Sequence, residues 1–214
     1  MSDFHHVSVL LAECLEGLAI KPDGVYVDGT LGGAGHSGEI VKQLTTGRLI
    51  GIDRDPVALS AAGKRLEPYG DRVTLVHSNF CEMTQAVKNL GLSGVDGILL
   101  DLGVSSPQLD DAERGFSYMA DAPLDMRMNS EDTLTADTVV NTWSQEELKR
   151  ILFDYGEERY APRIASAICR RRESAPIRTT LELVEVIRSA MPPQALREKQ
   201  RVLEVYGAAK LLRI

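Results

Sequence analysis

The feature that most constrains this chain is the alternation of β-rich runs with helical stretches in its first half. Apolar runs rich in β-forming residues lie at 24–28, 48–53, 73–77 and 95–101. Helical patterns separate them, one with Asp55 as predicted N-cap and Pro56 at its first position. Strands that alternate with helices form mainly parallel sheets. The sequence therefore predicts an α/β fold built on a Rossmann-like, doubly wound half-sheet.

The pattern changes after residue 101. Residues 102–130 carry Gly and Pro at irregular positions and are expected to be loop-like. A helical pattern follows from Ser144, which forms a predicted capping box with Glu147 ahead of Leu148, Ile151 and Leu152 on one face. Further helices are expected at about 161–172 and 180–190, the second opened by Thr179 or Thr180. We therefore expect a small helical module separate from the sheet.

Charge is distributed unevenly along the chain. The net charge is −7, which alone argues against a nucleic-acid partner, but residues 159–201 contain ten Lys and Arg and only four acidic residues. A basic segment of this kind is expected where a protein meets phosphate. A solvated basic helical face explains the same charges equally well, so charge alone leaves both interpretations open.

The sequence carries little sign of export, membrane insertion or metal binding. No basic region followed by an apolar stretch opens the chain, and no run of about 18 apolar residues occurs. The three cysteines are far apart and form no CxxC pair; they are Cys14, Cys81 and Cys169. We expect reduced thiols, no metal site, no membrane contact and a cytoplasmic protein.

A glycine-rich turn follows the first predicted strand. Residues 28–37 read DGTLGGAGHS. Glycines after a buried strand allow a tight turn and let the backbone approach a ligand at a helix N-terminus. The segment does not match GxGxxG cleanly, which disfavours a nicotinamide dehydrogenase. A purely structural turn remains an alternative on this evidence alone.

Polar and aromatic residues follow the next three predicted strands. Asp53 closes the second, where an acid is placed to accept hydrogen bonds from ribose hydroxyls. Phe80 follows the third and could cover an adenine face, although a core aromatic explains it as well. Asp101 ends the fourth, beside the expected cofactor and substrate. Acceptors there could hold an exocyclic amine in line for methyl transfer, with no strong base required.

Several blocks in this order resemble the RsmH (MraW) family. They are DGTLGGAGHS at 28–37, GIDRDP at 51–56, DLGVSSPQLD at 101–110, ERGFS at 113–117, PLDMRM at 123–128 and YGEER at 155–159. The likeness covers roughly residues 4–200. It implies methylation at N4 of a cytidine in the decoding region of 16S rRNA, with S-adenosylmethionine as the methyl donor.

The resemblance also implies site residues. The family's cofactor contacts fall on Ala34, Gly35, His36, Asp53, Phe80, Asp101 and Gln108, and the glycine turn adds Gly33. Of these, His36 and Gln108 rest on the resemblance alone. Asp101 is also the expected catalytic residue, as the group that positions the target amine.

With this resemblance, the chain divides into three expected parts. Residues 1–101 form the Rossmann-like cofactor-binding portion, and 102–200 form an inserted, mostly helical domain that recognises RNA. The expected partner is 16S rRNA within the small ribosomal subunit, and a homodimer is left open. The candidate phosphate contacts are Arg170, Arg171, Arg172 and Arg178.

The third part, residues 201–214, departs from the family pattern. Family members continue for about a hundred residues after a segment like Lys199-Gln200, so the chain is expected to lack their C-terminal third. The resemblance places further strands in that portion, so the fourth strand would become an edge with unpaired ladder groups. The alternative to an active enzyme is therefore a catalytically inactive remnant that at most binds the cofactor.

Overall fold

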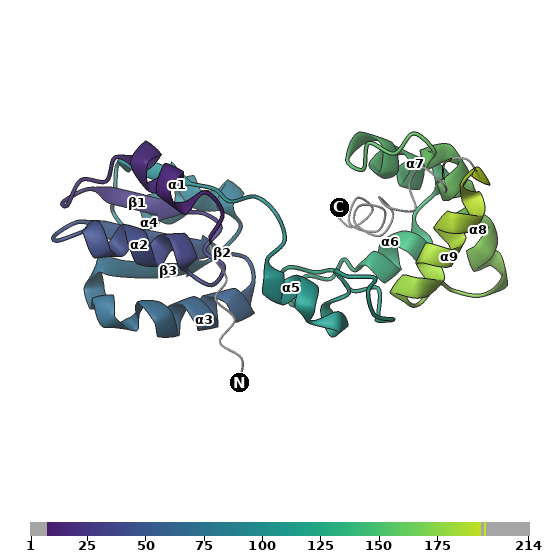
Figure 1. The fold of residues 1–214 in the computed structure, drawn as a ribbon, viewed down its shortest axis with the longest axis horizontal. Helices are drawn as coiled ribbons and strands as arrows, with labels where there is room; N and C mark the ends of the chain where they lie inside the picture. The colour runs from purple at the N-terminus through teal and green to yellow at the C-terminus, as the bar shows by residue number, and fades with distance from the viewer. Residues whose placement is uncertain (1–7, 194, 196–214) are drawn as a thin grey trace. The chain divides into compact units, whose positions relative to one another are not determined.

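The computed structural model describes residues 8–193 and residue 195. The chain divides into two compact units (Figure 1), Met1–Val104 with Met128–Ser130, and Ser105–Arg127 with Glu131–Ile214. The division thus follows Val104 rather than residue 101. The functional roles assigned to the expected parts stay predictions, and the segment 201–214 lies outside the described residues.

The first unit is built on a parallel sheet in the order β3-β2-β1-β4. Residue 26 of β1 pairs with residue 49 of β2, and residue 50 of β2 pairs with residue 74 of β3. The order and the parallel pairing confirm the predicted α/β, Rossmann-like arrangement. Its strands are β1 (Val25–Asp28), β2 (Arg48–Asp53), β3 (Val73–His77) and β4 (Gly97–Leu99).

Helices cover both faces of this sheet, because successive strand residues point to opposite sides. Tyr26 and Leu49 pack with α1 (Leu11–Leu18), α2 (Gly35–Gln43) and α3 (Pro56–Leu66). Val27 and Ile50 pack on the other face with α4 (Met83–Asn89). Two short 3-10 helices, η1 (Glu67–Arg72) and η2 (Phe80–Glu82), flank β3.

Helix α3 begins as predicted. The Asp55 side chain accepts a hydrogen bond from the Val57 backbone N–H at 3.0 Å, and Pro56 occupies the first turn. The sequence did not predict α1, which begins after Leu10 in a left-handed conformation and has no side-chain cap. Helix α1 therefore lacks a capping side chain at its start, and Glu13 in its first turn is a weak signal alone.

The prediction for the fourth strand was wrong in length. Residues 95–101 were expected to be extended, but β4 spans only Gly97–Leu99. The backbone N–H of Gly29 donates to the Leu99 carbonyl, and β1 then turns away into the glycine segment. Residues 100 and 101 consequently have no further ladder partner on β1. Among the described strands β4 pairs only with β1, and its Ile98 side chain is 48% exposed.

The second unit is helical. The segment 102–130 is only partly loop, since it contains α5 (Ser106–Asp110) and a 3-10 turn η3 (Ala112–Arg114) that the sequence did not predict. Capping by Ser144 and Thr179 is confirmed, because each side chain accepts a hydrogen bond from a backbone N–H three residues on. The main helices are α6 (Ala136–Thr142), α7 (Gln145–Asp154), α8 (Ala161–Ser174) and α9 (Thr180–Ala190).

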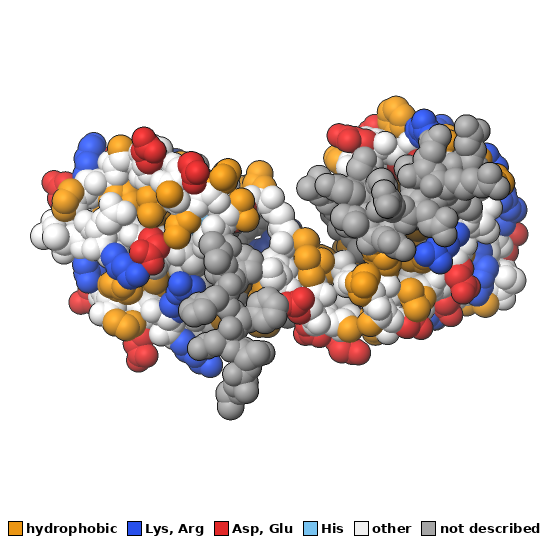
Figure 2. All heavy atoms as spheres, viewed as in Figure 1, with side chains coloured by type: hydrophobic (Ala, Val, Ile, Leu, Met, Phe, Trp, Pro, Cys, Tyr) orange, Lys and Arg blue, Asp and Glu red, His pale blue; other side chains and the backbone are white. Residues whose placement is uncertain are grey.

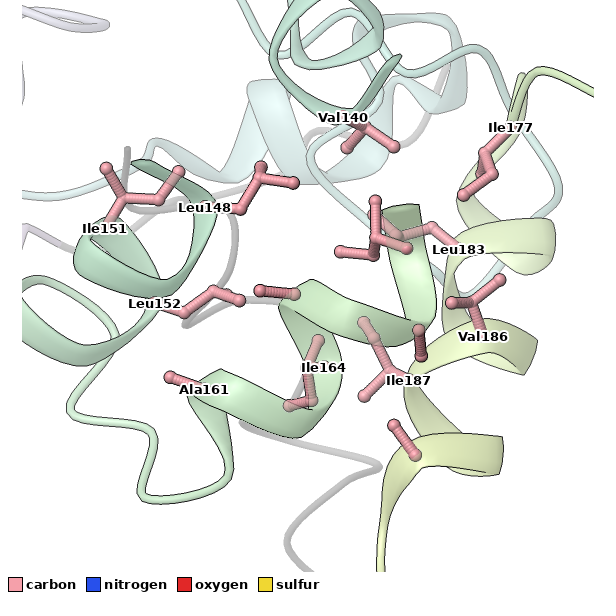
Figure 3. Packing of buried hydrophobic residues seen from close by; sticks show 14 of the residues in the cluster. Val140, Leu148, Ile151, Leu152, Ala161, Ile164, Ile177, Leu183, Val186 and Ile187 are labelled. Atoms are coloured by element: carbon pink, nitrogen blue, oxygen red, sulfur yellow. The ribbon is translucent and has the colours of Figure 1, made fainter. Parts of the chain in front are cut away.

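This unit has its own apolar core (Figure 3). The predicted face of α7 is buried, with Leu148 and Leu152 directed toward Ile164 of α8. Leu183, Val186 and Ile187 of α9 close the other side. Each fully buried aliphatic side chain contributes roughly 1.5–3 kcal/mol, so a continuous core of this kind is enough to hold the helices together.

No helix in the part of the chain that the structure describes is sufficiently long and apolar to span a bilayer. No group of three or more His, Cys, Asp or Glu side chains in the same residues could hold a metal ion. Cys14, Cys81 and Cys169 are free thiols.

Candidate functional site

A glycine turn leads from β1 into α2 at the carboxyl edge of the sheet. Gly32 has a φ of +50° and Ala34 a φ of 59°, so the turn uses the left-handed region twice. A side chain at Gly33 would meet nothing within 4 Å, so the turn is open to solvent at that residue. The turn therefore presents backbone to a ligand at the first residues of α2.

Asp53, the last residue of β2, holds this turn in place. One carboxylate oxygen accepts the Gly32 N–H at 2.8 Å, and the other accepts the Asp55 N–H at 2.9 Å. The side chain is half-buried. The sequence placed Asp53 at this edge, but its bond to the turn came only from the structure. The two bonds fix the orientation of the carboxylate.

Asp28 is a site residue that sequence reasoning missed. Its side chain is 2% exposed, and it accepts hydrogen bonds from the Ser37 hydroxyl at 2.7 Å and from the Thr30 N–H at 3.1 Å. Burial raises the pKa of the Asp28 carboxyl, and the two hydrogen bonds oppose that rise. An acid at the last position of a buried strand was the available signal. Asp28 ties α2 to the end of β1.

Phe80 and Asp101 lie next to the same turn. A side chain at Gly29 would come within 3.2 Å of the Phe80 Cβ and 2.5 Å of the Leu100 Cδ2. The Phe80 side chain is 37% exposed. The backbone N–H of Asp101 donates to the Thr30 hydroxyl at 2.7 Å, and the Asp101 side chain is exposed. The first unit thus brings Asp53, Phe80 and Asp101 to one turn.

His36 and Gln108 are both buried. The His36 Nε2 lies 2.9 Å from the Val9 carbonyl oxygen. Gln108 belongs to the helical unit, where its Oε1 accepts the Ser105 N–H at 3.0 Å and completes the capping box of α5. Cofactor contacts by these two side chains stay predictions.

The four predicted RNA-binding arginines have different surroundings. Arg172 is half-buried, and its guanidinium donates to the carbonyls of Val140 and Trp143, at 2.7 and 2.6 Å, at the end of α6. Arg178 forms an exposed ion pair with Asp137, with N and O atoms 3.2 Å apart. Arg172 therefore has a structural task that sequence reasoning did not foresee.

Arg170 and Arg171 line an open groove of about 390 Å³ between α8 and α9. Ala167 and Val186 also line it, and Glu182 and Glu185 of α9 contribute carboxylates. Figure 2 shows basic and acidic side chains interspersed over these helices rather than a uniform basic patch. The basic charge read from the sequence is thus partly balanced by neighbouring acids.

Comparison with known proteins identifies a family for this chain. A profile described as the MraW methylase family matches residues 3–210. Ribosomal RNA small subunit methyltransferase H from Brevibacillus brevis is 57% identical over 195 residues, which is 91% of this chain and 62% of that protein. The protein of the same name from Heliobacterium modesticaldum is 57% identical over 197 residues, 91% of this chain and 63% of its own length.

Solved structures resemble the chain more distantly. Precorrin 8w decarboxylase from Methanobacterium thermoautotrophicum aligns with a TM-score of 0.35 and 24% identity, over 44% of this chain and 50% of that chain.

The family match covers nearly the whole chain. The match reaches residue 210, and the chain spans about 62% of the length of the curated relatives. The glycine turn, Asp53, Phe80 and Asp101 all lie within the matched residues. The chain therefore belongs to the MraW methylase family.

Proposed function

We propose that this chain is an S-adenosylmethionine-dependent methyltransferase acting at N4 of a cytidine in the decoding region of 16S rRNA. The observation that carries the proposal is the bond from the Gly32 N–H to Asp53, which joins the glycine turn to the end of β2. In doubly wound folds nucleoside cofactors bind at this edge, with an acid on the ribose hydroxyls. Membership of a methylase family supports the reaction class.

The residues at the turn fit a nucleoside cofactor. Each Asp53 oxygen accepts one backbone N–H, and a carboxylate offers about four acceptor sites. Capacity therefore remains for ribose hydroxyls. Gly33 leaves open space beside the turn, and the partly exposed ring of Phe80 could cover an adenine face. S-adenosylmethionine supplies an electrophilic methyl group on its sulfonium sulfur.

Asp101 is the proposed catalytic residue. Its side chain is exposed, while its backbone N–H is held by the Thr30 hydroxyl at 2.7 Å. A carboxylate on a backbone anchored in this way can accept a hydrogen bond from the target amine. That bond would turn the lone pair of the amine toward the methyl group. The remaining proposed cofactor contacts are Ala34, Gly35, His36 and Gln108.

The proposed partner is 16S rRNA within the small ribosomal subunit, in the cytoplasm. Arg170 and Arg171 are the better candidates for phosphate contacts, because they line the open groove between α8 and α9, which they share with Glu182 and Glu185. Arg178 is exposed but shares its charge with Asp137. The internal bonds of Arg172 favour a structural role.

A catalytically inactive remnant that at most binds the cofactor is the second candidate. The exposed apolar side chains along and after β4 favour it, namely Ile98, Leu100, Leu102 and Val104. They follow a strand with one neighbour among the described residues. Catalysis and cofactor binding must therefore be tested separately.

Calorimetry of S-adenosylmethionine with the 214-residue chain tests the first step. We expect the wild-type chain to bind the cofactor. Asp53→Ala should weaken this binding by at least about tenfold, since the substitution removes the carboxylate that contacts both the ribose and the turn. Asp71→Ala, which removes an exposed acid of η1, is the matched control. Binding by a folded chain that Asp53→Ala leaves unchanged would contradict the assigned site.

Methyl transfer to 30S subunits from a strain lacking the modification separates the two candidates. A methylated cytidine located by mass spectrometry supports the enzyme, and its loss in Asp101→Ala supports the assigned catalytic residue. Cofactor binding without transfer supports the remnant.

A further inference from the structure

Three residues before α1 lie against the start of α2. We define Ser8, Val9 and Leu10 as the N-terminal strap. The Val9 carbonyl oxygen lies 2.9 Å from the His36 Nε2, and the strap meets Gly35 through Ser8. The side chains of Val9 and Leu10 are exposed. The strap is therefore attached to α2 mainly at two consecutive residues of the turn.

A side chain at Gly35 would meet the strap. A Cβ at this position would lie 2.0 Å from the Ser8 hydroxyl oxygen and 3.4 Å from the Ser8 Cβ. No positive φ requires glycine at residue 35, in contrast to Gly32. Gly33 differs again, because a side chain there would meet open space. The backbone at Gly33 is thus free to face a ligand, whereas Ser8 occupies the space beside Gly35.

The His36 ring bonds to the same strap. Its side chain is 7% exposed, and a carbonyl oxygen can only accept, so Nε2 carries the hydrogen and donates to Val9. A buried N–H requires such a partner. The adjacent Ser37 donates to the buried Asp28 at the end of β1. Residues 36 and 37 therefore bind the strap and the sheet to the same helical turn.

We propose that the strap is one wall of the cofactor site and that His36 is a positioning residue that acts through it. This rests on the proposed function. The strap lies against the first turn of α2, next to the open Gly33, where backbone N–H groups would face the cofactor. Release of the strap should then weaken cofactor binding, and a second substitution in the strap itself should restore it.

Two pairs of variants test the attachment. Gly35→Ala places a Cβ 2.0 Å from the Ser8 hydroxyl oxygen, so that oxygen must move, and adding Ser8→Ala removes it. His36→Leu removes the donor to Val9, whereas His36→Gln keeps an N–H at a similar reach. Gly17→Ala in α1 is the control, since a side chain there meets nothing within 4 Å.

The first readout is amide hydrogen exchange of the strap and α1 without cofactor. We expect exchange to rise about fivefold or more in Gly35→Ala and His36→Leu. It should return toward the wild-type rate in the double variant and in His36→Gln. Unchanged exchange in both single variants would show that neither contact holds the strap.

The second readout is the dissociation constant for S-adenosylmethionine, by calorimetry. We expect it to rise about tenfold in Gly35→Ala and to recover when Ser8→Ala is added. Failure to recover would mean that Gly35 serves the ligand directly, and a loosened strap with unchanged affinity would show that it is no wall. A wild-type chain that binds no cofactor would overturn both the proposed function and the role of the strap as a wall. Hydrogen exchange would then still test whether the strap is attached to α2.

Discussion

At the scale of residues, the same edge of the sheet holds two aspartates with different tasks. Asp53 is half-buried, each of its two carboxylate oxygens accepts one backbone N–H, and it is the proposed contact to the ribose. Asp28 is buried and accepts from Ser37 and Thr30, while burial raises its pKa. Their environments separate a binding role from a structural role.

The raised pKa of Asp28 predicts a pH dependence of stability. Its usual pKa is 3.8, and in the folded chain it is higher. Below pH 3.8 the carboxyl is protonated in both states, and as pH rises through the folded pKa the native state must bury a charge. Asp28→Asn removes this titration. The free energy of unfolding of the variant minus that of the wild type should therefore increase from pH 4 to pH 7. Urea titrations across this range measure it, and a difference independent of pH would contradict the assignment.

At the scale of elements, the helical unit is tied together by side chains that bond to helix ends. Arg172 of α8 donates to two carbonyls at the end of α6. The buried Thr180 hydroxyl accepts the Ala122 N–H at 3.2 Å and donates to the Ala120 carbonyl at 3.0 Å. These bonds explain why the segment around residue 122 packs with the helices.

Arg172→Ala should therefore destabilise this unit more than Arg170→Ala or Arg171→Ala. The loss leaves two carbonyls without a charged donor, which we expect to cost about 1.5–3 kcal/mol. Arg170 instead contacts a hydroxyl one turn back, and Arg171 contacts a carbonyl near the end of its own helix. Urea denaturation of the three variants measures the difference. Equal losses would contradict a special structural role for Arg172.

The same helices give a separate prediction for RNA. If Arg170 and Arg171 each meet a phosphate, Arg170→Ala should lower the salt slope of RNA binding by about one unit, and Arg171→Ala likewise. Titrations of a 16S rRNA fragment at several salt concentrations provide the slope. Lys149→Ala in α7, whose ammonium pairs with Glu146, is a control of equal charge change. An unaltered slope in both arginine variants would place the RNA elsewhere.

At the scale of the whole molecule, β4 is the feature with the largest physical consequence. It pairs with β1 alone among the described strands, and Ile98 is 48% exposed on it. An edge strand with unpaired backbone and exposed apolar side chains favours association with other chains. A homodimer is one form that such association could take.

Ile98→Lys should reduce self-association of the purified chain, because a charge on an edge strand opposes strand pairing. Sedimentation velocity over a range of protein concentrations measures the effect. Val57→Lys, at an exposed apolar residue of α3, is the matched control. Equal association of wild type and Ile98→Lys would show that β4 is not the contact surface.

Local patterns in the sequence determined the alternation of strands and helices from β1 to β4 and the caps at Asp55, Ser144 and Thr179. They also placed Asp53 at the sheet edge, whereas the cofactor contacts that the resemblance implies at His36 and Gln108 stay predictions. These results depend on residues close together in the chain, where periodicity and capping chemistry act directly.

Tertiary structure alone decided where β4 stops, what Gly35 contacts and what Arg172 does. Each depends on a partner distant in sequence: β1 turns away from β4, Ser8 fills the space at Gly35, and α6 supplies carbonyls to Arg172. Spacing along a chain does not encode such contacts, because they form only when separate elements pack. The physical reason is that a sequence pattern selects an element and its buried face, whereas packing selects the neighbour that the face meets.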